Sequence, residues 1–275
     1  MIHGLDHVAV AVADLDAAVR DYEALLGRTA ERGAPAVGAE RAWFHLENMS
    51  LELIAASGAG PAGDRVRARL DAAGEGLLIL AFAVEDLTAS AKLLERRGVR
   101  GHGRSDGAWS LHPADTDGIQ IVLMHRPAVN RPVLSQIGVA PDAAPRGLDH
   151  VVVHSPNPNR ALALYGAKLD LDLRLDRSNP DWGARQMFFR CGDLVIEIGH
   201  GLEAGVSDGP DGLGGLAWRM TQPAAVQARL ARAGFDVSEV RKGRKPGTEV
   251  FTVRDRTRGV PTLMLSASPR PTEGT

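Results

Sequence analysis

The same nine-residue opening occurs twice, as GLDHVAVAV from Gly4 and as GLDHVVVHS from Gly147, and six of the nine positions are identical. The two histidines, His7 and His150, lie 143 residues apart. The later segments MSLELI and DLVIEI also correspond, and they place Glu52 and Glu197 145 residues apart. An internal repeat of this kind predicts two similar halves, each with one histidine and one glutamate on strand-like segments.

A weaker repeat lies inside each half. LLILAFAVEDLTASAKLLERRGV, from Leu77, has the layout of LDHVAVAVADLDAAVRDYEALLG, from Leu5: an apolar run, an acidic turn and a helix pattern. The stretch that begins at Gly215 repeats it in the second half. We therefore expect four modules of the form β-α-β-β-β, starting near Ile2, Leu77, Arg146 and Gly212.

The first strand of each module has two different faces. In DHVAVAV, alternation puts valines on one face and His7, Ala9 and Ala11 on the other. The helix that follows has one apolar stripe, so the valine face is expected to pack against it. Capping signals mark the helix ends: Asp14 and Gly27 in the first module, and Asn157 with Pro158 in the third.

The segment 127–145 contains four prolines and little charge, which predicts a linker. We therefore divide the chain into a first domain at 1–126, this linker, a second domain at 146–268 and a tail at 269–275.

Composition narrows the class of protein. With 275 residues the chain can bury a sizeable core, and a net charge of −2 gives no field for nucleic acid or an anionic membrane. A single cysteine excludes a disulfide framework and a cysteine-rich zinc site. The first residues lack a signal-peptide pattern, and the longest apolar run is too short for a membrane span. We expect a cytoplasmic protein whose partner is a small molecule rather than nucleic acid or membrane.

A module of this form used four times, with DHV on the first strand and a glutamate on the last, resembles the vicinal oxygen chelate superfamily. That group includes glyoxalase I, extradiol dioxygenases, methylmalonyl-CoA epimerase and the bleomycin and fosfomycin resistance proteins. The resemblance implies an α+β fold in which four βαβββ modules pair into two curved mixed β-sheets with helices on the outside. It covers nearly the whole chain, but the superfamily hosts many reactions on one scaffold.

In the family, each module can supply one metal ligand from its first strand and one from its last. Carried over by position, the resemblance implies His7 with Glu52 and His150 with Glu197 as ligands of a divalent metal (Ni, Zn, Mn or Fe). The other ligand positions depart from the pattern and fall on Ile79, Val122, Gly215 and Leu263.

Two roles remain open for each histidine–glutamate pair. The pair can donate N and O ligands to a metal, or it can act without metal as an acid–base pair. Only a pairing of the first module with the third, within one chain or between two chains of a homodimer, would join all four residues in one site. An extradiol two-histidine triad is not expected, because His154 is too far along the strand from His150 and His200 falls on the face opposite Glu197.

The remaining positions on the concave faces predict mostly apolar pocket walls, as in sites for organic molecules. Substrate contacts are expected from Ile79, Val122 and Met124 in the first half, and from Arg219, Leu263 and His154 in the second. Arg219 either holds a substrate carboxylate or phosphate or pairs with a nearby acid.

Two functional hypotheses follow. One is a glyoxalase-like lyase or isomerase that removes a proton next to a carbonyl of a small oxygen-rich substrate. The other is a non-catalytic protein of the bleomycin-resistance type, which sequesters a ligand and has degenerate metal sites.

Overall fold

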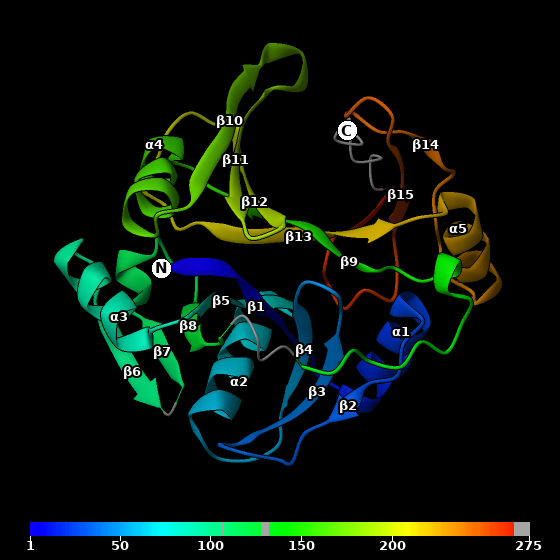
Figure 1. Ribbon diagram of the computed structural model, residues 1–275, viewed down its shortest axis with the longest axis horizontal. Coiled ribbons are helices and arrows are strands. Elements are labelled where there is room, and N and C mark those ends of the chain that lie inside the picture. Colours follow the sequence, from blue (N-terminus) through cyan, green and yellow to red (C-terminus); the bar gives the residue numbers. More distant parts are fainter. Residues whose placement is uncertain (106, 128–131, 267–275) are drawn as a thin grey trace, which may run out of the picture.

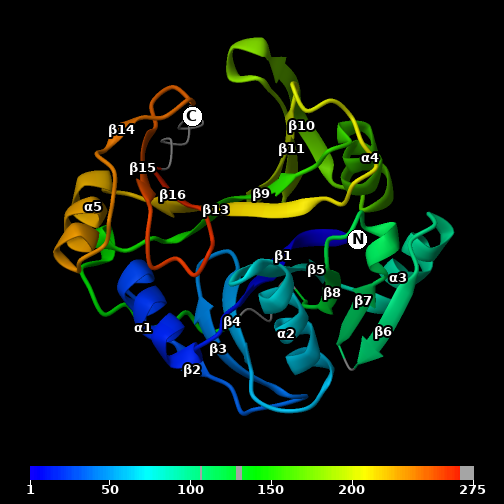
Figure 2. The same ribbon diagram turned by 180° about the vertical axis from the view of Figure 1, so that it is seen from behind.

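The computed structural model describes residues 1–105, 107–127 and 132–266. They form two eight-stranded mixed sheets that lie back to back, with their concave faces open to opposite sides of the molecule (Figure 1, and from behind in Figure 2). The expected α+β class with two curved sheets is confirmed. The tail expected at 269–275 lies outside the described residues.

Strand order is the same in the two sheets. The first sheet runs β2 (Glu31–Arg32), β3 (Ala39–His45), β4 (Ser50–Ala56), β1 (Ile2–Ala11), β5 (Gly76–Val84), β8 (Ile121–His125), β7 (Ala108–Leu111) and β6 (Gly101–Ser105). The second runs β10 (Asp172–Asn179), β11 (Ala184–Cys191), β12 (Leu194–Gly201), β9 (Gly147–His154), β13 (Gly212–Met220), β16 (Thr262–Ser266), β15 (Glu249–Val253) and β14 (Arg241–Lys242). In both, the first strands of two modules pair antiparallel at the centre, β1 with β5 and β9 with β13. The modules therefore pair one with two and three with four.

The helices follow the capping signals of the sequence. They are α1 (Leu15–Leu26), α2 (Pro61–Ala73), α3 (Leu87–Arg96), α4 (Pro158–Leu162) and α5 (Pro223–Arg232), and α4 continues into a π-helical turn, η3 (Ala163–Lys168). The Asp14 carboxylate accepts a hydrogen bond from the Ala17 amide at the start of α1, and Gly27 ends that helix with a φ of 63°. None of the described helices is long and apolar enough to cross a membrane.

One hydrophobic core joins the two halves. It contains the valine face of β1, the matching face of β9 and the apolar stripe of α1. The expected assignment of the valine face to the helix side is therefore confirmed. Both histidine faces point away from this core, toward the two concave surfaces.

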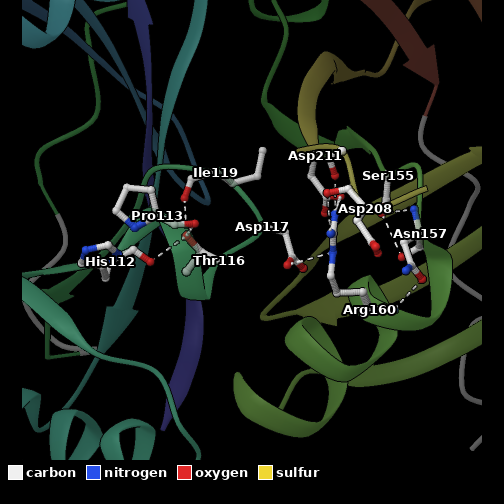
Figure 3. Close-up of polar contacts among 11 residues, drawn as sticks. His112, Pro113, Thr116, Asp117, Ile119, Ser155, Asn157, Arg160, Asp208 and Asp211 are labelled. Carbon is white, nitrogen blue, oxygen red and sulfur yellow. Dashed lines mark hydrogen bonds and ion pairs between the residues drawn. The ribbon is translucent and has the colours of Figure 1, made fainter.

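Polar contacts also connect the halves. The Arg160 guanidinium, at the start of α4, lies between Asp117 of the first half and Asp211 of the second, at 2.9 and 3.4 Å (Figure 3). The Asp211 amide also donates a hydrogen bond to the Asp117 carbonyl over 2.7 Å. Burial raises the pKa of both carboxyls, and the positive charge of Arg160 between them opposes this shift.

Helix α2 departs from the expected arrangement. It lies on the concave face of the first sheet, against β1, β3, β4 and β5, whereas the other helices lie on the outer sides (Figure 1). Its apolar side chains Ala62 and Val66 belong to a second buried cluster together with Ala9 and Ala11 of β1. The corresponding stretch of the second half, residues 202–211, contains no helix.

Candidate functional site

His150 and Glu197 meet on the concave face of the second sheet. They come from the neighbouring parallel strands β9 and β12, and the His150 Nε2 lies 3.5 Å from the Glu197 Oε2. The side chains are 17% and 14% exposed, so both reach solvent while remaining mostly enclosed. This is an ion-pair distance, and an imidazole and a carboxylate so placed can transfer a proton through one water or after a small approach.

Asp149 holds the other nitrogen of the same imidazole. Its Oδ2 lies 2.9 Å from the His150 Nδ1, and its Oδ1 accepts a hydrogen bond from Arg219 over 3.0 Å. Burial, the strongest single influence, raises the pKa of Asp149, but the hydrogen bonds and charges of His150 and Arg219 outweigh it and lower the pKa overall. Asp149 is therefore an anion that accepts a hydrogen bond from the Nδ1–H and fixes the orientation of the ring.

A β-bulge at Asp149 turns its side chain toward the ring of His150. In the β9–β13 ladder, Ala217 pairs with His150 and Trp218 with Leu148, so Asp149 is an extra residue without a partner. Strict alternation would turn adjacent side chains to opposite faces, and a bulge re-aims one of them. The first sheet has the same irregularity at Asp6, between Leu5 and His7.

A polar chain runs from Glu197 to the mouth of the concavity. Gln186 donates a hydrogen bond to the Glu197 Oε1 over 2.6 Å, and Arg177 donates one to Gln186 over 3.4 Å. The Arg177 guanidinium also lies 4.9 Å from the centre of the Trp182 ring, and the Arg244 guanidinium lies 4.3 Å from it. Trp182 therefore connects the β10–β11 hairpin to the β14–β15 turn.

The first half contains a corresponding pair with different neighbours. The His7 Nε2 lies 3.6 Å from the Glu52 Oε2, and the His7 Nδ1 contacts Asp6 at 2.7 Å. Here the Glu52 Oε1 is held by the Arg41 guanidinium at 2.8 Å. Ladder registers make Arg41 the counterpart of Gln186, because Trp43 faces Glu52 as Phe188 faces Glu197.

The first pair is also more deeply buried. The His7 and Glu52 side chains are only 9% and 6% exposed, and burial raises the pKa of Glu52. Ile79, Val122 and Met124 were expected to line a pocket here, but they pack with α2 in the second buried cluster. They therefore form a core, and the pocket expected in the first half is filled by helix α2.

The second concave face has no such cover among the described residues. Along β12, buried and partly exposed residues alternate, whereas six consecutive residues of β4 are buried. Leu263, on β16, is partly exposed on this face next to Ala217. His154 is exposed at the end of β9, and a Cβ at Gly214 would lie 2.5 Å from its Nε2, so that glycine makes room for the ring.

Arg219 forms ion pairs with two aspartates. Besides Asp149, it binds the Asp193 carboxylate at 3.1 Å and the Asp193 carbonyl. Pairing with a nearby acid was one of the two roles that the sequence left open for Arg219, the other being direct binding of the substrate. In the structure Arg219 lies at the edge of the site and contacts Asp149, which in turn holds the His150 imidazole.

The arrangement that would join all four family ligand residues within one chain is wrong. His7 with Glu52 and His150 with Glu197 lie on separate sheets whose concave faces open in opposite directions. The registers put Ile79 and Val122 of the first sheet at the positions of Gly215 and Leu263 in the second. Within the described part of the chain, no three His, Cys, Asp or Glu side chains are grouped so as to hold a metal ion.

The family models match both halves. A glyoxalase-like domain model matches residues 5–129, and a model of the glyoxalase/bleomycin resistance protein/dioxygenase superfamily matches residues 149–252. The ethylmalonyl-CoA/methylmalonyl-CoA epimerase of Cereibacter sphaeroides is 33% identical over 145 residues, a match that covers 45% of this chain and 98% of the epimerase. The chain belongs to the glyoxalase/bleomycin resistance protein/dioxygenase superfamily, which confirms the resemblance seen in the sequence.

Solved structures show the same fold over nearly the whole chain. A mutant of 4-hydroxymandelate synthase from Streptomyces coelicolor has a TM-score of 0.73 and 15% identity, and the match covers 98% of this chain and 94% of that one. The Mn(II)-bound glyoxalase from Novosphingobium aromaticivorans has a TM-score of 0.68 and 17% identity, with coverages of 98% and 83%. At these identities the likeness concerns the fold alone.

Sequence reasoning missed Asp149, Gln186 and Arg41. The DH dipeptide is visible in both repeats, but strict alternation would turn its aspartate to the face opposite the histidine. A charged residue at position 41 and an amide at position 186 occupy equivalent strand positions, and only the ladder register reveals this equivalence.

Proposed function

We propose that the protein is an enzyme of the lyase or isomerase type that removes a proton next to a carbonyl, and that the reaction takes place in the second concavity. The observation that carries this proposal is the His150–Glu197 pair, held at its outer ends by Asp149 and Gln186, on a face that no described helix covers. The name of the Cereibacter relative, an epimerase, supports this reaction class.

The geometry suggests how the proton moves. Asp149 accepts a hydrogen bond from the Nδ1–H, which leaves the Nε2 as the reactive nitrogen and stabilises the ring when it becomes positive. Glu197, 3.5 Å away, shares the proton that the Nε2 takes up. The Gln186 amide keeps the Glu197 carboxylate in place without adding a positive charge. Such a pair can take a proton from a substrate carbon and return it.

A resident metal does not fit this donor set. Each concave face offers one imidazole nitrogen and one carboxylate, and the two further family positions hold Ile79 and Val122 or Gly215 and Leu263. Catalytic divalent metals in proteins generally have three protein ligands. We therefore propose that His150 and Glu197 act directly on the substrate. Elemental analysis tests this: stoichiometric Ni, Zn, Mn or Fe that is lost in His150→Ala would contradict the metal-independent assignment.

The main experiment is exchange of substrate protons with solvent. A panel of carbonyl compounds and thioesters with an α-hydrogen is incubated with the protein in D₂O, and loss of the α-proton signal is followed by NMR. We expect exchange for at least one compound, slowed about 100-fold or more in His150→Ala. His125→Ala, at an exposed position at the end of β8 in the first half, is the matched control and should retain the rate. Tight binding without exchange across the panel would instead favour the ligand-sequestering alternative.

A further inference from the structure

A basic pocket lies at the end of the second concavity where β9 and β12 begin. It has a volume of about 820 Å³ and is lined by parts of both halves. Arg219 and Asp149 line it and also belong to the His150 site, because Asp149 holds the His150 Nδ1. A ligand in this pocket therefore lies one side chain away from the proposed reactive imidazole.

The charge of the lining is predominantly positive. It contains five cationic residues, Arg146, Arg174, Arg190, Arg219 and Lys245, and three acids, Glu47, Asp149 and Asp193. The acids are engaged by two of the cations, since Arg219 binds both aspartates and Arg146 binds Glu47.

The other three cations are not compensated within the pocket. Arg190 donates its Nε–H to the Gly192 carbonyl, which leaves its charge unbalanced, whereas Arg174 forms an ion pair at 2.9 Å with Asp172, which lies outside the lining. Lys245 has no ion pair with any of the described residues. Arg190, Arg174 and Lys245 come from β11, β10 and the β14–β15 turn, so three separate elements contribute cationic side chains to the lining of this pocket.

The equivalent end of the first half lacks this charge. Its pocket contains Arg126 as the single arginine or lysine among the described lining residues, and Arg126 is bound to Asp6 at 2.6 Å. Ladder registers place His45 where the second half has Arg190, and Ala83 where it has Arg219. The basic lining is thus a property of the half whose concavity is open.

We infer that this pocket binds the phosphate part of an organic phosphate whose reacting carbon reaches the His150–Glu197 pair. Guanidinium groups bind phosphate oxygens through paired, charge-assisted hydrogen bonds. The lining has five cations against three acids, and two of the cations, Arg190 and Lys245, have no anionic partner among the described residues. This excess of positive charge matches a group with several negative charges better than a single carboxylate, which one arginine would neutralise. The inference deepens the proposed function and rests on it for the orientation of the ligand.

Calorimetric titration with inorganic pyrophosphate tests the pocket without any need for turnover. At physiological ionic strength we expect one pyrophosphate per chain, and about tenfold weaker binding for each of Arg174→Gln and Arg190→Gln. Arg96→Gln, an exposed arginine on α3 of the first half, is the matched control and should bind like the unmodified protein. Thermal melts followed by circular dichroism verify that all three variants are folded.

Absence of pyrophosphate binding would overturn the inference, and so would binding that the double variant Arg174→Gln/Arg190→Gln retains. Succinate titrated in parallel separates phosphate from carboxylate recognition, and equally tight succinate binding would also contradict the assignment. A failure here leaves proton exchange at His150 untouched, whereas a failure of the proposed function appears as absent exchange with pyrophosphate binding intact.

Discussion

The two concave faces of this molecule carry the same histidine–glutamate pair, but the pair is covered in the first half and open in the second. In the first half, Arg41 neutralises Glu52 and α2 covers the face. In the second, a neutral amide from Gln186 replaces the guanidinium, and the stretch 202–211 forms no covering helix. The internal repeat thus contains two copies of one pair, and we propose that the first copy is structural and the second reactive.

The largest expected effect on the free energy of unfolding comes from disrupting the contact between helix α2 and the first sheet. Val66→Asp places a charge in the apolar contact between α2 and the sheet, where Val66 is fully buried. We expect the free energy of unfolding to fall by about 3 kcal/mol or more, because a buried carboxylate without a partner is costly.

The control for this change is Ala68→Asp, at an exposed position of the same helix. It should alter the free energy of unfolding by about 0.5 kcal/mol or less. Equal losses in urea unfolding for the two variants would mean that α2 is not held by its apolar contact with the sheet.

Exchanging the two glutamate partners sharpens the contrast. Arg41→Gln leaves the buried Glu52 without its guanidinium, and we expect a loss of about 1–3 kcal/mol in the free energy of unfolding. Gln186→Arg places a cation against Glu197 on a partly exposed face, so the fold should tolerate it while α-proton exchange slows about tenfold. The account fails if Gln186→Arg exchanges protons at the normal rate.

A smaller effect is expected at the mouth of the second concavity. Trp182→Ala removes the ring that lies between Arg177 and Arg244, and exposed cation–π contacts contribute about 0.5–1 kcal/mol each. Hydrogen exchange measured by mass spectrometry should become faster in residues 241–250 and remain unchanged in the first half. Unchanged exchange at 241–250 would show that Trp182 does not connect the two hairpins.

The smallest expected effect is a dependence of stability on pH. Burial raises the pKa of Glu52 above its ordinary value of 4.5, so the folded state holds this proton more tightly than the unfolded state. As pH rises from 4.5 through the raised value, the unfolded state loses the proton first, and this group lowers the free energy of unfolding.

Glu52→Gln should therefore remove part of the decline in stability above pH 4.5. The exposed Glu40, on the neighbouring strand β3, provides the control, and Glu40→Gln should leave the pH profile unchanged. Parallel profiles for the unmodified protein and Glu52→Gln would contradict the raised pKa.

Much of the fold was predictable because its signals are local. The repeat fixed the module plan, alternation separated the valine and histidine faces of β1, and Asp14 and Asn157 cap the helices expected from them. The position of α2 was not foreseen, although Pro61 and the spacing of Ala62, Val66 and Leu70 indicate a helix. Its place on the concave face depends on the small alanines of β1, which leave room for a helix to pack there.

The candidate site was predictable only in its centre. His150 and Glu197 are marked by the repeat, whereas Asp149 reaches the imidazole through a bulge that no simple alternation rule anticipates. Gln186 and the basic pocket depend on the pairing of strands that are distant in the sequence. The packing of helix α2 against the first sheet, rather than the type of the paired residues, decides which of the two pairs is exposed.

The most direct test compares Glu52→Gln with Glu197→Gln in the α-proton exchange assay. Both changes replace a carboxylate with an amide of the same shape, at equivalent positions of the two sheets. The account predicts that Glu197→Gln slows exchange about 100-fold or more while Glu52→Gln retains the rate of the unmodified protein. Equal losses in the two variants, or a loss confined to Glu52→Gln, would contradict the assignment of the reaction to the second half.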